Sequence, residues 1–526
     1  MSYSQQKTFE EFYFEASKQK ILNNQEKALK LFQSALETYP KSDATMYQLA
    51  RLFYQMDQYN QALYWSEKAV STSKNYNKWY FGQLAQFYNR FGKYEESAKV
   101  FQSMIGEEPD NKENYIEAAN QFFNAKKYQE SIAVLMEMQT RFGIEEASST
   151  RLEYVYTSIG ESEMALAELE KLSKKYPTNT NFKGYLSDGY MKAGQTDKAI
   201  QQLKEIVALD SNEGFAYYAL YNIYDESGDK DRAFYNLKKA FQADNLDIQQ
   251  KLQATSSFFL QLKKNARVKK EMLELSDILV SKYPNIIEPY ILKTDIYATL
   301  EDYVTARNYA LEAIKVNASD FKSWSKLLSL NAKLNDPNLQ IEDTERAIEL
   351  FPNMAGLYTA RAYALMEVEK FEEAANTVNE GLEVAVEKPD KLELLLCGAS
   401  CYNKLENYEK SDGLYEKILN MSPNNSLAMN NYAYNLAVRN SKLQYADSLI
   451  NSALILEPRN PYFMDTKAWV LYSMGSYENA LEWLLKAVDI DPRNPEYYEH
   501  LYAVYNKLGN DSKAKEMSNK LKELSK

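Results

Sequence analysis

Residues 457–495 read EPRNPYFMDTKAWVLYSMGSYENALEWLLKAVDIDPRNP, and the five residues that open this stretch return almost unchanged at its end. Pro458 and Pro492 mark the offset between the two copies, which is 34 residues. Between them lie Gly475, Ala480 and two runs of apolar residues at helical spacing. Self-similarity at a fixed period of this length is the signature of a repeat protein.

The same pattern can be followed along the whole chain in about fifteen units. Counted from the start of a unit, it has a large residue at position 4, a small residue at 8, Gly near 15, Ala at 20 and Pro at 32. Gly stands at position 15 in several units, at Gly92, Gly160, Gly194, Gly228, Gly475 and Gly509. The units start near residues 9, 43, 78, 112, 146, 180, 214, 253, 287, 321, 355, 392, 426, 461 and 495.

Each position has a physical reason. Apolar residues at positions 4, 7, 8 and 11 form one stripe of a first helix, and those at 20, 24 and 27 form a stripe of a second. Small residues at 8 and 20 allow the two backbones to approach, Gly at 15 ends the first helix in a left-handed conformation, and Pro at 32 stops the second. One such unit cannot bury its apolar faces alone, so the pattern predicts a stack of helix-turn-helix units.

This pattern resembles the tetratricopeptide repeat, a helix-turn-helix unit of the same length, over residues 9–523. The resemblance implies an all-α fold, a right-handed α-α superhelix of about 15 units. It also implies that the first helix of each unit lines the concave surface. Position 8 departs from the family pattern, because it is usually Ala here and seldom Gly.

The spacing predicts three segments. An N-terminal block of about seven units covers 1–245, an irregular joint covers 246–286, and a second block of about seven units with a C-terminal capping helix covers 287–526. The joint lacks the signature Ala and follows the longest spacing. It carries the one basic cluster, interpreted either as a solvated joint or as a docking point for an acidic partner: Lys263, Lys264, Arg267, Lys269 and Lys270.

Composition disfavours several classes of protein. The net charge of −12 argues against a nucleic-acid partner, which needs a broad positive surface. No apolar window is long enough for a transmembrane segment, and the first residues do not read as a signal peptide. Membrane association is therefore expected only through a removed lipoprotein leader or through a partner.

No constellation of residues indicates catalysis. His500 is the single histidine, which argues against His-based triads and metal clusters, and no phosphate-binding glycine loop is present. Cys397 and Cys401 lie one helical turn apart, too far from that histidine in sequence to suggest a metal site, and are expected to be small buried hydrophobes. We therefore expect no enzyme activity, no cofactor and no metal.

The positions expected to face the concave groove are more informative. Tyr and Trp are rigid contact residues suited to binding hot spots, although single rings can also pack between units. Some proteins of this family use Lys and Asn at two positions to hold a C-terminal carboxylate. Tyr13 and Ser17 occupy these positions here, so the sequence does not predict a carboxylate-binding site of this kind. The candidate partner-binding residues are Tyr47, Arg51, Tyr54, Tyr154, Tyr218, Tyr363, Asn430, Tyr434, Asp465 and Trp469, with Asn431 and Asn435 beside them.

The leading hypothesis is a non-enzymatic scaffold that binds proteins or extended peptides. Residues 12–40 and 77–105 also resemble tetratricopeptide lipoproteins of Bacteroidota, which implies a periplasmic, outer-membrane envelope assembly if a leader has been removed. The alternatives are a cytoplasmic, co-chaperone-like adaptor and an accessory subunit of an enzyme complex. A catalytic domain would need a long stretch outside the repeats, and the repeats leave none.

Overall fold

The computed structural model describes residues 3–524, and all of the secondary structure in that range is helical. Thirty α-helices and one short 3₁₀ helix follow one another, which confirms the all-α prediction of about fifteen helix-turn-helix units. Each helix of residues 3–524 is too short or too polar to cross a bilayer. The helices fall into two compact units, Met1–Lys251 and Leu252–Lys526.

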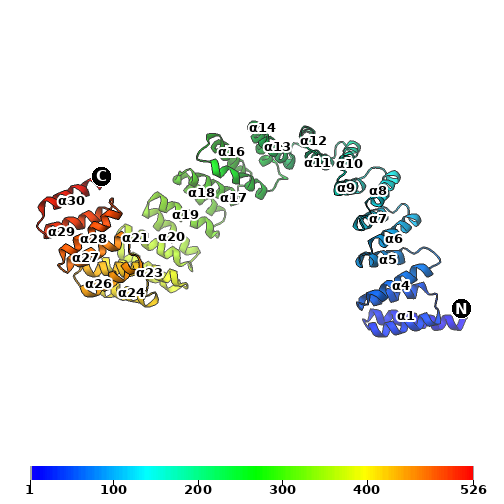
Figure 1. Cartoon of the computed structure of the whole chain (residues 1–526), viewed down its shortest axis with the longest axis horizontal. Coiled ribbons are helices and arrows are strands. Elements are labelled where there is room, and N and C mark those ends of the chain that lie inside the picture. The colour runs from blue at the N-terminus through cyan, green and yellow to red at the C-terminus, as the bar shows by residue number, and fades with distance from the viewer. Residues whose placement is uncertain (1–2, 525–526) are drawn as a thin grey trace. The chain divides into compact units, whose positions relative to one another are not determined.

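The first unit is a row of seven helical hairpins, in which each helix contacts its neighbours in sequence (Figure 1). Its first helices are α1 (Tyr3–Ile21), α3 (Asp43–Gln55), α5 (Lys78–Arg90), α7 (Lys112–Asn124), α9 (Glu146–Ser158), α11 (Thr180–Lys192) and α13 (Gly214–Glu226). Its second helices are α2 (Gln25–Thr38), α4 (Tyr59–Thr72), α6 (Tyr94–Glu107), α8 (Tyr128–Phe142), α10 (Ser162–Lys175), α12 (Thr196–Leu209) and α14 (Lys230–Gln242).

The second unit continues the same pattern. Its first helices are α17 (Glu288–Thr299), α19 (Phe321–Leu334), α21 (Ala355–Glu367), α23 (Lys388–Lys404), α25 (Ser426–Val438), α27 (Pro461–Ser473) and α29 (Pro495–Lys507). Its second helices are α16 (Ala266–Lys282), α18 (Tyr303–Val316), α20 (Pro337–Leu350), α22 (Phe371–Val384), α24 (Tyr408–Met421), α26 (Leu443–Leu456), α28 (Tyr477–Ile490) and α30 (Asp511–Leu524).

The irregular stretch between the hairpins is built differently. It begins with the eight-residue helix α15 (Ile248–Thr255) and the 3₁₀ helix η1 (Ser256–Gln261), which lead into α16. Two members of the basic cluster are engaged in exposed ion pairs, Lys263 with Glu301 and Arg267 with Glu271. Exposed pairs of this kind contribute little stability.

The turn inside each hairpin depends on a left-handed residue at position 15 of the unit. The six glycines named above have φ between 69° and 83°. In eight other units the same position also has positive φ but is not Gly: Asn23, Asp57, Lys126, Glu301, Asn335, Glu369, Glu406 and Asn440. The hairpin geometry therefore requires this conformation whichever residue is present, although it is strained for side chains other than Gly and Asn.

The two helices of a hairpin meet through small residues. Position 20 is a fully buried Ala in many units, for example Ala374 and Ala480. Where it is Ser, the hydroxyl donates a hydrogen bond across the hairpin to the carbonyl of the Ala at position 8, as Ser97 does to Ala85 at 2.8 Å. The buried hydroxyl is therefore satisfied without widening the contact.

Successive units are joined by a recurring hydrogen bond from the aromatic residue at position 4. Tyr358 donates its hydroxyl to the carbonyl of Pro352 at 2.9 Å, six residues earlier, in the turn that ends the preceding unit. The same bond joins Tyr115 to Pro109, Tyr290 to Pro284 and Tyr498 to Pro492, while Trp324 donates its indole N–H to Ala318. The large residue at position 4 thus fills the core and also satisfies a turn carbonyl.

The repeated stretch at 457–461 and 491–495 forms the entry to a first helix. Asn460 and Asn494 cap α27 and α29, since each side-chain oxygen accepts a hydrogen bond from a helix N–H two residues on, at 3.1 and 3.0 Å. Pro461 and Pro495 follow at the first helical position, where the missing N–H costs nothing.

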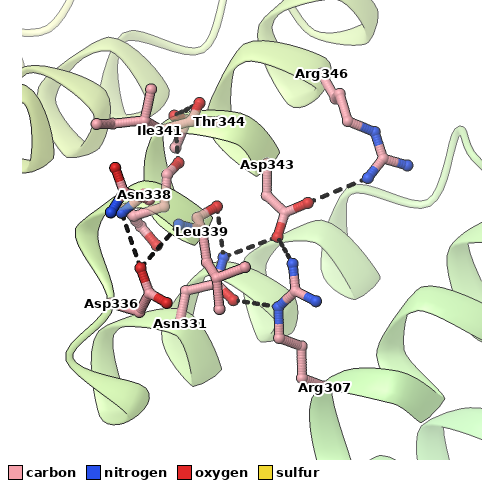
Figure 2. Close-up of polar contacts among 10 residues, drawn as sticks. Arg307, Asn331, Asp336, Asn338, Leu339, Ile341, Asp343, Thr344 and Arg346 are labelled. Carbon is pink, nitrogen blue, oxygen red and sulfur yellow. Dashed lines mark hydrogen bonds and ion pairs between the residues drawn. The ribbon is translucent and has the colours of Figure 1, made fainter. Parts of the chain in front are cut away.

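A buried polar network joins α18, α19 and α20 (Figure 2). The carboxylate of Asp343, fully buried, accepts hydrogen bonds from Arg307 at 2.5 Å and from the Asn331 amide at 2.9 Å. Arg346, half exposed, approaches its other oxygen at 3.1 Å. A buried carboxylate is tolerated because its partners replace the lost water.

Candidate functional site

A large cleft of the first unit runs along α1, α3 and α5 and reaches α6 and the turn that follows it. Its volume is about 1140 Å³, and Tyr47, Arg51 and Tyr54 all line it. We call it the N-terminal groove. The structure therefore brings three of the candidate residues together on one surface.

Aromatic rings form much of this groove. Tyr47 packs against Tyr80, with ring centroids 4.9 Å apart, and Tyr54 stacks on Phe87 at the same distance. Both candidate tyrosines therefore also pack between adjacent units, the alternative considered from the sequence. Trp79 differs, because it lines the groove with its side chain 65% exposed.

A buried amide opens onto the N-terminal groove. Gln83 lines the groove, is only 8% exposed, and neither its amide nitrogen nor its amide oxygen has a hydrogen-bond partner within residues 3–524. An unpartnered buried amide costs free energy, and a ligand backbone that supplies one donor and one acceptor would satisfy both atoms.

Positive charge predominates at the groove. Arg51, Lys78 and Arg90 line it, against a single lining carboxylate, Glu108. Lys20 lies beside it and donates to Gln48, another lining residue, at 2.7 Å. Burial, with the repulsion of Arg51, lowers the pKa of Lys20 to about 8. This excess of cations contrasts with a chain whose net charge is −12.

A smaller cleft of about 270 Å³ lies in the second unit, along α23, α25, α27 and α29. Asn430, Tyr434 and Asp465 line it together with Asn431 and Asn435. We call it the C-terminal cleft.

Trp469 lies next to that cleft. Its ring stacks on the imidazole of His500 with centroids 4.2 Å apart, and Tyr434 lies 6.3 Å from the same ring. Burial raises the pKa of Tyr434 to about 12, and carboxylates including Glu496 add to this effect. Three candidate residues, Tyr434, Asp465 and Trp469, therefore lie around a histidine that the sequence did not connect with them.

The remaining candidates do not gather with these two groups. Tyr154 is 59% exposed and lines a cleft of about 350 Å³ with Arg151. Tyr218 packs beside Tyr221 in the first unit. Tyr363 lines a cleft of about 230 Å³ in the second unit, and burial raises its pKa to about 12.

Cys397 and Cys401 are both buried free thiols, which confirms that they belong to the core. The hydrogen bond between the two thiols, together with burial, raises the pKa of Cys397.

The residues that sequence reasoning missed are Trp79, Gln83, Lys20 and His500. Trp79 and Gln83 stand at positions 2 and 6 of their unit, whereas the residues expected to face the groove were taken from positions 5, 9 and 12. His500 lies 35 residues beyond Asp465, so only the 34-residue period could have indicated that adjacent units bring them together.

The fold defines the class of this protein as a solenoid of stacked helical hairpins, and three comparisons with family profiles agree with it. Residues 14–42 match a profile described as tetratricopeptide repeat, and residues 470–509 match a profile described as TPR repeat. Residues 55–138 match a profile described as anaphase-promoting complex, cyclosome, subunit 3. The chain therefore contains tetratricopeptide repeats in these two segments.

A curated relative is a tetratricopeptide repeat-containing protein of Pseudomonas aeruginosa, 28% identical over 136 residues. The match covers 26% of this chain and spans 22% of the length of that relative.

Similar solved structures cover most of the chain at low identity. The APC/C hetero-tetramer Cut9–Hcn1 matches with a TM-score of 0.37 and 12% identity, over 92% of this chain and 94% of that one. Yeast Tom70 matches with a TM-score of 0.34 and 16% identity, over 92% of each chain.

Proposed function

We propose that this protein is a non-enzymatic scaffold that holds a partner protein by an extended, acidic segment bound in the N-terminal groove. The observation that carries the proposal is the combination of an exposed Trp79, an unpartnered buried Gln83 and an excess of cations in one large groove. No other cleft described above combines these three features.

Each feature matches one property of such a segment. The Trp79 ring offers apolar contact area at low entropic cost. The Gln83 amide can pair with both polar groups of a peptide unit. Arg51 and Arg90 attract carboxylates and orient the segment, which affects the association rate more than the affinity.

Fluorescence anisotropy with labelled decapeptides tests the proposal directly. An aromatic-containing peptide rich in Asp and Glu is expected to bind, and the matched peptide with Lys in place of the acidic residues is not. The affinity for the acidic peptide should fall as salt rises, because the attraction is electrostatic.

Charge reversal locates the site. The double variant Arg51→Glu, Arg90→Glu is expected to weaken the acidic peptide at least tenfold, while Lys30→Glu, on the second helix α2 and outside the groove lining, leaves it unchanged. Equal affinities for the two peptides, or an unchanged affinity in the double variant, would show that the groove is not the binding site.

We also propose that the partner belongs to a bacterial envelope assembly, on the resemblance of residues 12–40 and 77–105 alone. Fractionation of cells that express the full gene tests this location. Recovery of the protein only with the cytosolic fraction would contradict it.

A further inference from the structure

Three metal-ligating side chains meet at the edge of the C-terminal cleft. Asp465 comes from α27, while Glu496 and His500 lie one turn apart on α29. One ligand atom from each lies within 4.8 Å of the others, and the imidazole Nδ1 is 2.8 Å from an Asp465 oxygen. Asp465 and His500 are 4% and 6% exposed, so both are shielded from solvent.

An Asp–His hydrogen bond alone would account for two of these residues but leaves other features unexplained. Glu496 brings a second negative charge beside Asp465, and like charges at such a distance repel. Trp469 stacks on the imidazole and fixes its orientation.

Asn430 supplies an independent indication of a ligand. It is 8% exposed and lines the same cleft as Asp465 and Glu496. Its amide nitrogen donates to Asn431 at 3.1 Å, whereas its amide oxygen has no hydrogen-bond partner in the described part of the chain. Asn430 therefore has a buried amide oxygen that could accept a hydrogen bond or bind a cation, in a residue that lines the same cleft as two carboxylates.

We propose that Asp465, Glu496 and His500 form a binding site for one divalent transition-metal ion, with Zn²⁺ as the ion that fits best. Two carboxylates and a neutral imidazole match the charge of the ion, and oxygen and nitrogen ligands suit zinc at about 2.0–2.2 Å. The fourth position is open to Asn430, to water or to a group of a bound partner.

The geometry needs only small adjustments to accept the ion. Ligand atoms around tetrahedral zinc are about 3.4 Å apart. Asp465 and His500 therefore separate slightly, and the exposed Glu496 side chain closes inward. Because the ligands come from the first helices of two successive units, the ion ties these units together and stabilises the C-terminal end of the array.

The single histidine gives this site an unambiguous probe. In the full chain labelled with ¹⁵N only at histidine, Zn²⁺ is expected to shift the imidazole resonances and saturate at one ion per chain. Co²⁺ should give visible absorption without the intense near-ultraviolet band of thiolate ligation, which separates this site from Cys397 and Cys401. Unmoved imidazole resonances at saturating Zn²⁺ would overturn the proposal, and this measurement needs no variant.

Matched variants assign the ligands. His500→Gln, Asp465→Asn and Glu496→Gln are each expected to weaken Zn²⁺ at least tenfold in calorimetry, whereas Glu499→Gln, an exposed carboxylate on the same helix, is not. Circular dichroism checks that each variant is folded. Affinity in His500→Gln equal to that of the unmodified chain would place the bound metal elsewhere and reject the site.

Discussion

At the scale of the residue, the turn of each hairpin shows what the sequence reveals and what it hides. Gly475 indicates a left-handed turn, because Gly favours this conformation. Glu369 and Lys126 adopt the same conformation, but their residue types do not predict it. Only the spacing from neighbouring signature residues places them there. The conformation is imposed by the packing of the two helices, which overrides local preference.

Glu369→Gly is expected to stabilise the protein by about 1 kcal/mol, because it relieves the left-handed strain at an exposed residue. Glu380→Gly is the same change inside the exposed face of α22, where it should cost about 1 kcal/mol. Denaturant unfolding of both variants measures the difference. Destabilisation by both would mean that the turn does not favour Gly.

The ionisation of Lys20 is expected to make the affinity for an acidic peptide depend on pH. Its pKa of about 8 in the free protein means that it loses its charge as the pH rises from 7 to 9. A bound carboxylate favours the charged form, so the affinity for an acidic peptide should fall severalfold over this range. Anisotropy titrations of Lys20→Met should show a flatter profile, and parallel profiles would exclude a contribution from Lys20.

At the scale of the element, close packing of helices is set by small residues whose importance the sequence shows only in part. The pattern of small residues at positions 8 and 20 predicted the hairpin contact. Gly381 stands at position 27 of its unit, another small-residue position of the pattern, and an added Cβ there would lie 2.7 Å from the Cβ of Tyr358 in the first helix of the same unit. The added Cβ would also lie 3.0 Å from Leu394 in the first helix of the next unit, so this close approach depends in part on packing between units.

Gly381→Ala is therefore expected to destabilise the protein by about 1–3 kcal/mol, because α22 must move away from α21. Gly413→Ala provides the control, since this exposed glycine inside α24 has no atom within 4 Å of its added Cβ. It should stabilise by about 0.5–1 kcal/mol through helix propensity. Thermal unfolding of the two variants should shift in opposite directions, and equal shifts would contradict the packing argument.

The sequence predicted site residues only at the repeat positions that were expected to face the groove. Tyr47 and Arg51 came from such positions and line the N-terminal groove. Gln83 and His500 both stand at position 6, which was not expected to face the groove, and burial without a partner and contact between units are properties of three-dimensional packing.

At the scale of the whole molecule, helices contact mainly their neighbours in sequence, so stability is expected to be local. Asp343→Ala should destabilise the region around α18–α20 by about 3–5 kcal/mol, because it leaves the mostly buried Arg307 without its carboxylate. Arg346→Ala removes a half-exposed partner and should cost less than about 1 kcal/mol.

Hydrogen exchange read by mass spectrometry can measure where this stability is lost. In Asp343→Ala, protection should fall in α18–α22 and remain unchanged in α1–α6. A uniform loss of protection along the chain would instead show that the protein unfolds as one cooperative body.

The hydrogen bond from Tyr358 to Pro352 connects only one unit with the turn before it, and Tyr115, Tyr290 and Tyr498 make the same bond elsewhere. Because these joints are interchangeable, a gene that gains or loses one complete unit of 34 codons restores a matching joint at the break. A loss that cuts into the six residues between the proline and the tyrosine removes the bond. Insertions and deletions in this chain are thus expected to add or remove whole units. Such changes would also lengthen or shorten the surface that can contact partners.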